Sequence, residues 1–351
     1  MNELKFASDV AVKDVLGVRK NEKVLIITNP VNDVLKISNA LYDSVNDSGA
    51  VPVLMIQNVK TQLDFAEPSV IDAIKSKPDI VLSISREKLG KDKYGLKHPY
   101  RKKHDHVFDY LLHEKKIRSF WSPGITIDMF EKTIPINYQA LRKNCGKLKK
   151  LLTKTVSAEI KTEKGTDIKI GLKGRKGGAD DGDFTKPGRG GNLPCGEVFI
   201  SPELGTSNGT IVFDGSISSH KGEIIIKNPI RVDVKNGFVE KIYGEKEAKE
   251  LIKTLRDAEK KTEQRKLPKS YIKNIRNLGE LGIGLNPKAR IVGNMLEDEK
   301  VLSTCHVAIG ANYDNDANAI THLDGLIKKA TINLTFKNGE MLVMEDGILK
   351  I

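Results

Sequence analysis

The sequence predicts an α/β N-terminal domain with a Rossmann-like parallel sheet, followed by an α+β, strand-rich C-terminal metal-binding domain. Three observations support this fold class. The chain has 351 residues, which is long for one small module. Short apolar runs alternate with amphipathic segments over residues 1–150, as they do in parallel sheets covered by helices. From 151 to 351, alternating apolar and polar residues are bounded by Gly, Asn or Pro, which is typical of strands and hairpins.

The first domain is predicted from apolar runs that alternate with helical spacing. Expected strands cover 23–30, 52–59 and 119–126, a helix covers 34–49, and 69–85 contains a helix, a turn and a strand. We expect the strand at 52–59 to be buried. The first strand leads into T-N-P-V-N-D instead of a G-x-G-x-x-G turn, and no P-loop is present. The sequence therefore gives no support to dinucleotide or nucleoside triphosphate binding.

The second domain is predicted from hairpin patterns. Residues 156–172 alternate around a Lys-Gly turn, and the C-terminal hairpin has an Asn-Gly turn at 338–339. Glycine and charged residues dominate 174–192, so we expect an exposed loop there. The charged segment 245–266 has helical spacing and little apolar surface.

Composition excludes several classes of protein. Hydrophobic residues make up 39% of the chain and charged residues 30%, and no apolar run approaches the ~20 residues of a membrane helix. No secretory signal pattern is visible, so we expect a cytoplasmic protein without a membrane partner. Three cysteines, none in a C-x-x-C pair, cannot form a disulfide framework or a thiolate zinc site.

The net charge is +12 and is uneven along the chain. Residues 1–150 hold 26 basic and 18 acidic residues (+8), and the remainder holds 32 and 28 (+4). The densest basic stretch, 91–108, can contact phosphates, but a mixed charge run is more typical of a solvated surface. We therefore expect no nucleic-acid partner, and a basic binding module remains the third-ranked alternative.

Four segments of the second domain concentrate residues that bind metals. They are N-L-P-C-G-E (192–197), N-L-G-E-L-G-I-G-L-N (277–286), D-E-K-V-L-S-T-C-H-V-A-I-G (298–310) and T-H-L-D-G (321–325). Glu280 lies in a nearly uncharged stretch whose only basic neighbour is Arg276, and a metal would supply the missing charge. His322 and Asp324 are two apart, so on a strand they share a face. Imidazoles with carboxylates suit Zn²⁺, Co²⁺, Mn²⁺ or Fe²⁺.

Simpler explanations exist for each residue taken alone. An H-x-D pair is as often a hydrogen-bonded structural pair, and Glu197 alone is more typical of a strand-edge surface carboxylate. The metal site is favoured because four separate segments each supply such a side chain in an apolar context.

In this order, the four segments resemble those of the family M29 metallo-aminopeptidases, the aminopeptidase T group. F-W-S-P-G-I-T-I-D-M-F at 120–130 is similar to a segment in that family's N-terminal domain. The resemblance implies a homodimer that hydrolyses small peptides. It also implies two divalent ions (Zn, Co or Mn) bound by two glutamates, two histidines and an aspartate, which correspond here to Glu197, Glu280, His306, His322 and Asp324.

We therefore predict an aminopeptidase that releases N-terminal residues with metal-activated water. Glu280 is expected to carry a proton and Tyr313 to hydrogen-bond the tetrahedral oxyanion, and Glu299 corresponds to a further acidic residue.

A second function remains open. The D-E-K-V-L-S-T-C-H stretch also resembles ring-opening dioxygenases of the dihydroxypyridine type, which use one Fe²⁺ held by two histidines and one carboxylate. His306, His322 and Asp324 match that set. The presence of both Glu197 and Glu280 favours the two-metal peptidase.

Overall fold

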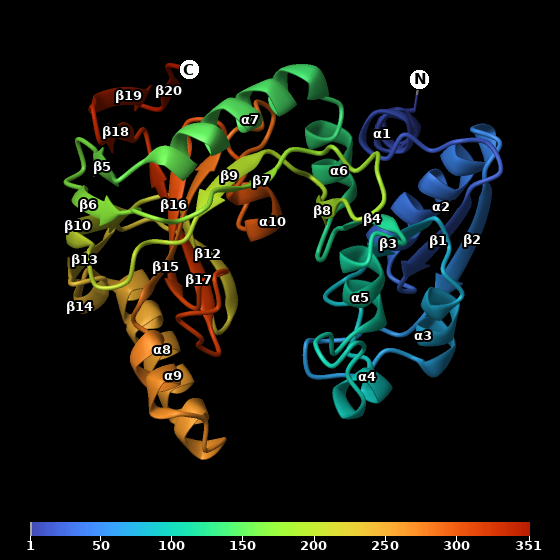
Figure 1. Ribbon diagram of the computed structural model, residues 1–351, viewed down its shortest axis with the longest axis horizontal. Coiled ribbons are helices and arrows are strands. Elements are labelled where there is room, and N and C mark those ends of the chain that lie inside the picture. Colours follow the sequence, from blue (N-terminus) through green and yellow to red (C-terminus); the bar gives the residue numbers. More distant parts are fainter. Residues whose placement is uncertain (1) are drawn as a thin grey trace. The chain divides into compact units, whose positions relative to one another are not determined.

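The computed structural model describes residues 2–351, which form two compact units (Figure 1). The N-terminal unit contains the chain up to Arg142 together with Asp180–Cys195, and the C-terminal unit contains Lys143–Ala179 and Gly196–Ile351. The chain first passes between the units inside helix α7 (Tyr138–Lys154), the helix that also contains the predicted boundary at residue 150. One boundary does not describe the division, because residues 180–195 return to the N-terminal unit.

The N-terminal unit is built on a five-stranded parallel sheet, as the sequence predicts. The strand order is β2-β1-β3-β4-β8. The strands are β1 (Lys23–Thr28), β2 (Val51–Ile56), β3 (Ile80–Ile84), β4 (Arg118–Trp121) and β8 (Gly190–Asn192). Neighbouring parallel strands need crossover connections, and helices supply those that join β1 to β2, β2 to β3 and β3 to β4 (Figure 1).

The helices of this unit are amphipathic. In α2 (Asn32–Asp47) the fully buried residues Val34, Ile37, Leu41 and Val45 recur at helical spacing. The helix ends before Gly49, which has a φ of 77°. Glycine has no Cβ atom, so it adopts this left-handed conformation with little strain. The remaining helices are α1 (Glu3–Val10) with a π-helical continuation (Ala11–Val15), α3 (Pro68–Lys75), α4 (Lys93–Lys97), α5 (Val107–His113) and α6 (Ile127–Thr133).

Two expectations for these segments are wrong. Strand β2 is an edge strand with one neighbour, so Val51, Val53 and Ile56 are each about half exposed (53%, 52% and 53%) instead of buried. The glycine-rich segment 174–192 is not only an exposed loop. It contains the short strand β7 (Gly178–Asp180) and β8, which pairs with β4 and completes the parallel sheet.

Two strand-rich sheets form the C-terminal unit, which confirms the predicted fold class. The eight-stranded sheet has the order β14-β13-β10-β6-β5-β18-β19-β20. Its strands are β5 (Ser157–Lys161), β6 (Asp167–Gly171), β10 (Asn208–Phe213), β13 (Ile230–Lys235), β14 (Phe238–Tyr243), β18 (Thr331–Phe336), β19 (Gly339–Glu345) and β20 (Ile348–Leu349). Both predicted hairpins, β5–β6 and β18–β19, are present and antiparallel.

The seven-stranded sheet has the order β12-β11-β17-β16-β15-β9-β7. Besides β7, its strands are β9 (Glu197–Ile200), β11 (Ser216–Ser219), β12 (Gly222–Ile225), β15 (Leu278–Gly284), β16 (Thr304–Gly310) and β17 (His322–Lys328). The four central strands β17, β16, β15 and β9 pair antiparallel. They contain all five of the predicted metal ligands, so this sheet positions the candidate site.

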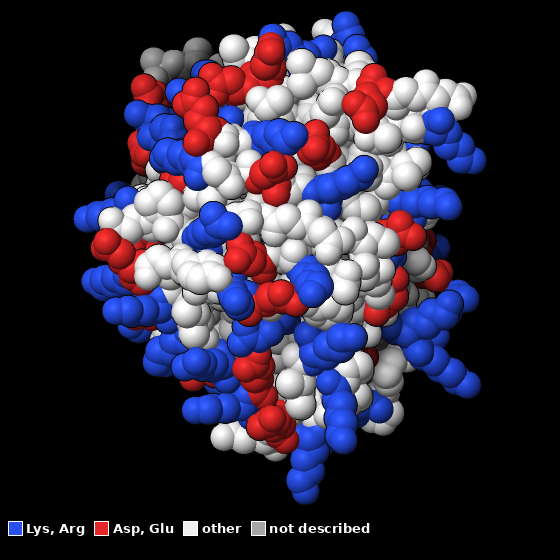
Figure 2. Space-filling model, turned by 90° about the vertical axis from the view of Figure 1, so that its left-hand side faces the viewer, with Lys and Arg blue, Asp and Glu red and all other residues white. Residues whose placement is uncertain are grey.

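Helices complete the C-terminal unit. They are α8 (Lys246–Gln264), α9 (Lys269–Asn274) and the short α10 (Met295–Asp298). In α8, a narrow face of Ala248, Leu251, Leu255 and Ala258 is buried, as expected for a charged helix with one apolar stripe. Among the residues described, none of the helices combines the length and apolar character that crossing a bilayer requires. On the face shown in Figure 2, Lys and Arg side chains are scattered among Asp and Glu.

Candidate metal centre

The predicted ligands lie on one face of the seven-stranded sheet, and small residues face them across the strands. Glu197 pairs with Gly284, His306 with Gly282, and His322 with Gly310. Ala308 lies between Glu280 and Asp324. Residues directly opposite in antiparallel strands have neighbouring Cβ atoms, so Gly and Ala leave room for the long ligand side chains.

Gly282 shows how tight this arrangement is. A Cβ atom at this position would overlap Nε2 of the His306 imidazole. Gly282 and Gly284, which alternate with Leu281 and Ile283, therefore lie on the ligand face of β15. That alternation is visible in the sequence.

The ligand side chains converge in three overlapping groups. They are Glu197, Glu280 and His306; Glu280, His322 and Asp324; and Glu299, His306 and Asp324. Within each group the potential ligand atoms all lie within 4.8 Å of one another. Each group contains one histidine and two carboxylates, a donor set that suits a divalent transition metal.

Glu280 lies between the two imidazoles. Its Oε1 is 3.3 Å from His306 Nε2, and its Oε2 is 3.2 Å from His322 Nε2. Because its two oxygens face different histidines, this carboxylate can belong to two metal positions at once. Arg276, the only basic neighbour in the sequence segment, instead pairs with Glu259 at 2.7 Å.

The histidine ring of His322 is oriented by the backbone. Its Nδ1 lies 2.8 Å from the carbonyl oxygen of Ala311. A carbonyl only accepts hydrogen bonds, so Nδ1 donates and Nε2 points toward Glu280 and Asp324. Fixing the ring through its second nitrogen is the usual way in which proteins prepare an imidazole for a metal.

A fully buried lysine lies beside the ligands. Lys300 Nζ is 2.6 Å from Glu197 Oε1 and 2.6 Å from Glu299 Oε1, and its side chain has no exposed surface. Glu299 is the C-terminal cap of α10 and Lys300 follows it, so that short helix brings both residues to the sheet. Sequence reasoning missed Lys300, although the adjacent acidic and basic residues at 299 and 300 are visible there.

Burial and neighbouring charges shift the pKa values of the candidate ligands. Burial raises the pKa of Glu197 to about 8, against the opposing charge of Lys300. Burial lowers the pKa of His306, but Glu280 and other carboxylates outweigh it and raise the value to about 9. Asp324 and Glu280 likewise outweigh burial at His322 and raise its pKa to about 12. In the metal-free site the four carboxylates are thus balanced by Lys300 and by protons on the two imidazoles, and metal ions would displace these protons.

Unsatisfied atoms show that the residues fit a metal. Glu197 Oε2, His322 Nε2 and Asp324 Oδ1 are buried and form no hydrogen bond of good geometry among the residues described. Buried polar atoms are normally satisfied. These three atoms point into the site, where metal ions would satisfy them.

The structure brings together all five predicted ligands, and Glu299 joins them. Tyr313 follows β16 and lies at the edge of the site. Its ring centroid is 5.1 Å from that of His322 and 5.3 Å from that of Phe199, and the residue is 60% exposed. The cysteines take no part in these groups. Cys305 is buried beside His306 in β16, and burial raises the pKa of its thiol to about 12.

A family comparison covers this region. The model of the NicX family, 2,5-dihydroxypyridine 5,6-dioxygenase, matches residues 126–334, which is more than half of the chain. The chain belongs to the NicX family. The matched residues of this NicX family member include every candidate ligand. No curated protein sequence matches the chain.

Two solved structures share the fold of this NicX family member over nearly its whole length. The 2,5-dihydroxypyridine dioxygenase from Pseudomonas putida KT2440 has a TM-score of 0.74 at 16% identity and covers 99% of this chain and 96% of its own. Wild-type AmpT from Thermus thermophilus has a TM-score of 0.68 at 16% identity and covers 99% of both chains. At this identity the likeness shows a common fold. It supports the M29 resemblance in part and does not separate hydrolase from dioxygenase.

Proposed function

We propose that this protein is a metal-dependent aminopeptidase whose two divalent ions share Glu280. The observation that carries the proposal is the position of Glu280, whose two oxygens face different histidines. Glu280 belongs to two of the three close groups. A carboxylate with one oxygen toward each imidazole is well placed to bind an ion on each side.

Two of the three groups can each hold one ion. Glu197, Glu280 and His306 would hold the first ion, and Glu280, His322 and Asp324 the second. When bound, the ions would polarise a peptide carbonyl and lower the pKa of a water molecule from 15.7 to about 7. Zn²⁺, Co²⁺ and Mn²⁺ all suit these donors.

The remaining residues have separate tasks in this proposal. Because both oxygens of Glu280 would be ligands, Glu280 would fix the spacing of the two positions, and the proton transfer expected of it from the sequence falls to another carboxylate. Glu299, held through one oxygen by Lys300, is the carboxylate left to carry a proton to the leaving amine. The exposed Tyr313 can donate a hydrogen bond to the tetrahedral oxygen. Small peptides as substrates, a homodimer and a cytoplasmic location stay predictions.

A second candidate is a mononuclear Fe²⁺ dioxygenase that opens a dihydroxylated heteroaromatic ring. The match to the NicX family favours it. His306, His322 and Asp324 contain the two histidines and one carboxylate that such an iron site uses. In the structure, however, the two histidines belong to different close groups, each completed by carboxylates.

Metal stoichiometry and substrate turnover, measured together, separate the two functions. The protein is reconstituted with Zn²⁺, Co²⁺ or Mn²⁺, metal per chain is measured by elemental analysis, and aminoacyl substrates are assayed for release of the N-terminal residue. A parallel sample is loaded with Fe²⁺ under anaerobic conditions and tested for O₂ uptake with a dihydroxypyridine. Two ions with hydrolysis support the peptidase. One iron with O₂ uptake, and no hydrolysis with any metal, refutes it.

A further inference from the structure

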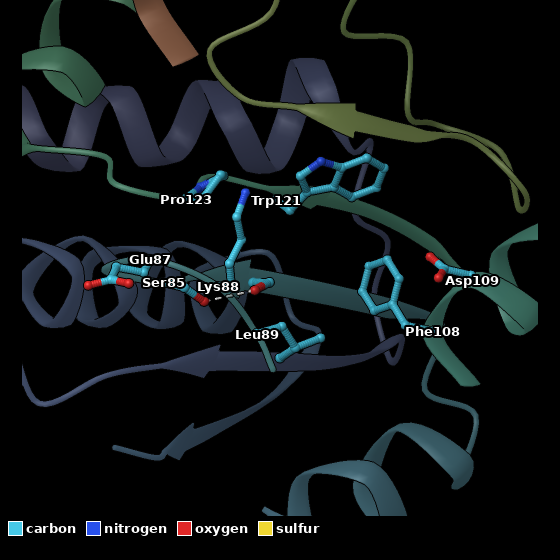
Figure 3. Close-up of a pocket in the computed structure, with 9 residues that line it drawn as sticks. Ser85, Glu87, Lys88, Leu89, Phe108, Asp109, Trp121 and Pro123 are labelled. Atoms are coloured by element: carbon cyan, nitrogen blue, oxygen red, sulfur yellow. Dashed lines mark hydrogen bonds between the residues drawn. The ribbon is translucent and has the colours of Figure 1, made fainter. Parts of the chain in front are cut away.

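A cavity lies in the N-terminal unit, at the carboxyl ends of two neighbouring parallel strands (Figure 3). Ser83 and Ser85 lie at the end of β3, and Trp121 and Pro123 at the end of β4. In open α/β sheets, ligands bind outside the carboxyl ends of the strands, near the point where the strand order reverses. Here the order β2-β1-β3-β4 reverses between β1 and β3, next to the cavity.

Aromatic rings form the walls of this cavity. Phe108 and Trp121 meet edge to face, with ring centroids 5.9 Å apart and an interplanar angle of 77°. Phe108 is buried, and Trp121 and Leu89 pack against the same apolar core. An edge-to-face pair is a favourable arrangement that holds both rings in place, so a flat apolar ligand would meet a preformed surface.

Two buried hydroxyls lie beside the aromatic walls. Ser83 and Ser85 are only 5% and 2% exposed, and their Oγ atoms are 3.0 Å apart. Backbone hydrogen bonds from Ser122 and Gly124 to the carbonyls of these serines hold the β3 end against the β4 end. One hydroxyl donates to the other, so the second hydroxyl keeps its hydrogen for an oxygen atom of a ligand.

Charged side chains of both signs surround the cavity. Glu87 and Lys88 come from the loop after β3, and Asp109 from the first turn of α5. Figure 3 shows the Lys88 side chain extending toward Trp121 and Pro123. Among residues 2–351, Glu87 and Lys88 form no salt bridge with a side chain, whereas the Asp109 carboxylate interacts electrostatically with His106 and His104. A ligand with one positive and one negative group would complement them.

The volume limits the ligand to a small molecule. The cavity measures about 230 Å³, the space of about eight water molecules at the ~30 Å³ that each occupies in the liquid. One six-membered ring with a short polar chain fits this volume, whereas a dinucleotide or a folded peptide does not.

We propose that this cavity binds a free aromatic amino acid. The aromatic ring would lie against Phe108 and Trp121, the carboxylate would meet Lys88 and the serine hydroxyls, and the ammonium would meet Asp109. The argument uses only residues of the N-terminal unit and does not depend on the function proposed for the metal centre.

The protein contains a single tryptophan, Trp121, so tryptophan fluorescence reports directly on this cavity. The full-length protein is titrated with L-phenylalanine, which does not emit in the tryptophan range. We expect a saturable change in emission. Lys88→Met and Asp109→Asn should each weaken binding about tenfold, the loss of one charge-assisted contact. Lys36→Met, a change at an exposed lysine of α2, should leave binding unchanged.

Three comparisons complete the test. The first is titration in the presence of a chelator, which should give the same curve. An amino acid can also bind a metal, so loss of the response would place binding at the metal centre and overturn the proposal. Phenylpropionate and phenethylamine, which each lack one charge, should bind about tenfold more weakly. Equal binding of either analogue, equal binding by Lys88→Met, or no saturable response to L-phenylalanine at millimolar concentration would also overturn it.

Discussion

Lys300 donates a hydrogen bond to Glu197 across 103 residues of sequence, with Nζ 2.6 Å from Oε1 in a fully buried environment. The same ammonium bonds one oxygen of Glu299. Glu197 thus keeps one oxygen for a metal, and Glu299 keeps one oxygen for the proton that we propose it carries. Lys300 neutralises part of the acidic site before any metal binds and leaves Glu197 a single oxygen for ligation.

Replacing this lysine should destabilise the metal-free protein. Lys300→Met removes the buried ammonium that pairs with Glu197 and Glu299, and breaking a buried ion pair typically costs about 3–5 kcal/mol of unfolding free energy. We expect added divalent metal to restore part of the loss, because metal bound only by the folded state stabilises it. Denaturant unfolding with and without metal measures both effects.

Lys288→Met is the matched control, because Lys288 is exposed in the same unit and its side chain forms no ion pair with any residue described. Its unfolding free energy should stay within about 0.5 kcal/mol of the wild type. If Lys300→Met does not fold, Lys300→Arg, which keeps the charge, should fold and lose less stability. Wild-type stability in Lys300→Met would contradict the role that we assign to this lysine.

Glu280 and Glu197 should differ in their effect on metal content. Glu280→Gln removes the carboxylate common to both positions, so we expect loss of both ions and a fall in aminopeptidase activity of more than about a hundredfold. Glu197→Gln removes a ligand of one position only and should retain about one ion per chain. Elemental analysis checks this difference, and identical metal contents in the two variants would argue against a shared carboxylate.

Gly282 should not tolerate a side chain. A Cβ at this position overlaps the His306 imidazole, so Gly282→Ala must displace a ligand of the site. We expect weaker metal binding and a loss of roughly 1–3 kcal/mol of stability from overpacking. Gly146→Ala serves as the control. Gly146 lies within helix α7, and a Cβ atom at this position meets no other atom within 4 Å. That change should stabilise the protein by up to about 1 kcal/mol.

Tyr313 can be tested separately from metal binding. Tyr313→Phe keeps the ring beside His322 and removes only the hydroxyl. If the hydroxyl stabilises the tetrahedral oxygen, kcat should fall about a hundredfold while KM and metal content change little. An unchanged kcat would show that the hydroxyl does not take part.

The ion pair between Glu22 and Arg118 predicts a pH dependence of stability in the N-terminal unit. Arg118 donates to both oxygens of Glu22 at 3.0 and 2.5 Å, and its side chain is buried. Burial opposes ionisation of Glu22, but the hydrogen bond from Arg118 outweighs it and lowers the pKa below 4.5. The ion pair therefore contributes its full stabilisation above about pH 4.5, the pKa of this carboxyl in the unfolded chain. The stabilisation is lost as the pH falls through the lower pKa of the folded state.

The variant Glu22→Gln should accordingly lose about 1.5–3 kcal/mol of unfolding free energy at neutral pH, and its difference from the wild type should narrow in acid. Glu67→Gln breaks the more exposed pair with Lys60 and should cost less than about 1 kcal/mol. Parallel denaturation curves for the wild type and both variants across the acid range provide the measurement. A constant gap for Glu22→Gln at all pH values would contradict the lowered pKa.

Local patterns in the sequence determined the fold class and the candidate ligands. Alternation predicted the hairpins β5–β6 and β18–β19, and the H-x-D spacing predicted that His322 and Asp324 share a strand face. These features depend on residues close together in the chain, so the spacing at which apolar and polar side chains alternate is sufficient to predict them.

Tertiary structure decided the features that depend on distant neighbours. Whether the apolar strand β2 is central or at the edge depends on how many strands pair with it, and the return of residues 180–195 to the parallel sheet depends on pairing with β4. The contact between Lys300 and Glu197 likewise joins residues far apart in sequence. Apolar period and ligand spacing are properties of a segment, whereas sheet position and the charge balance of a buried site are set only when segments pack together.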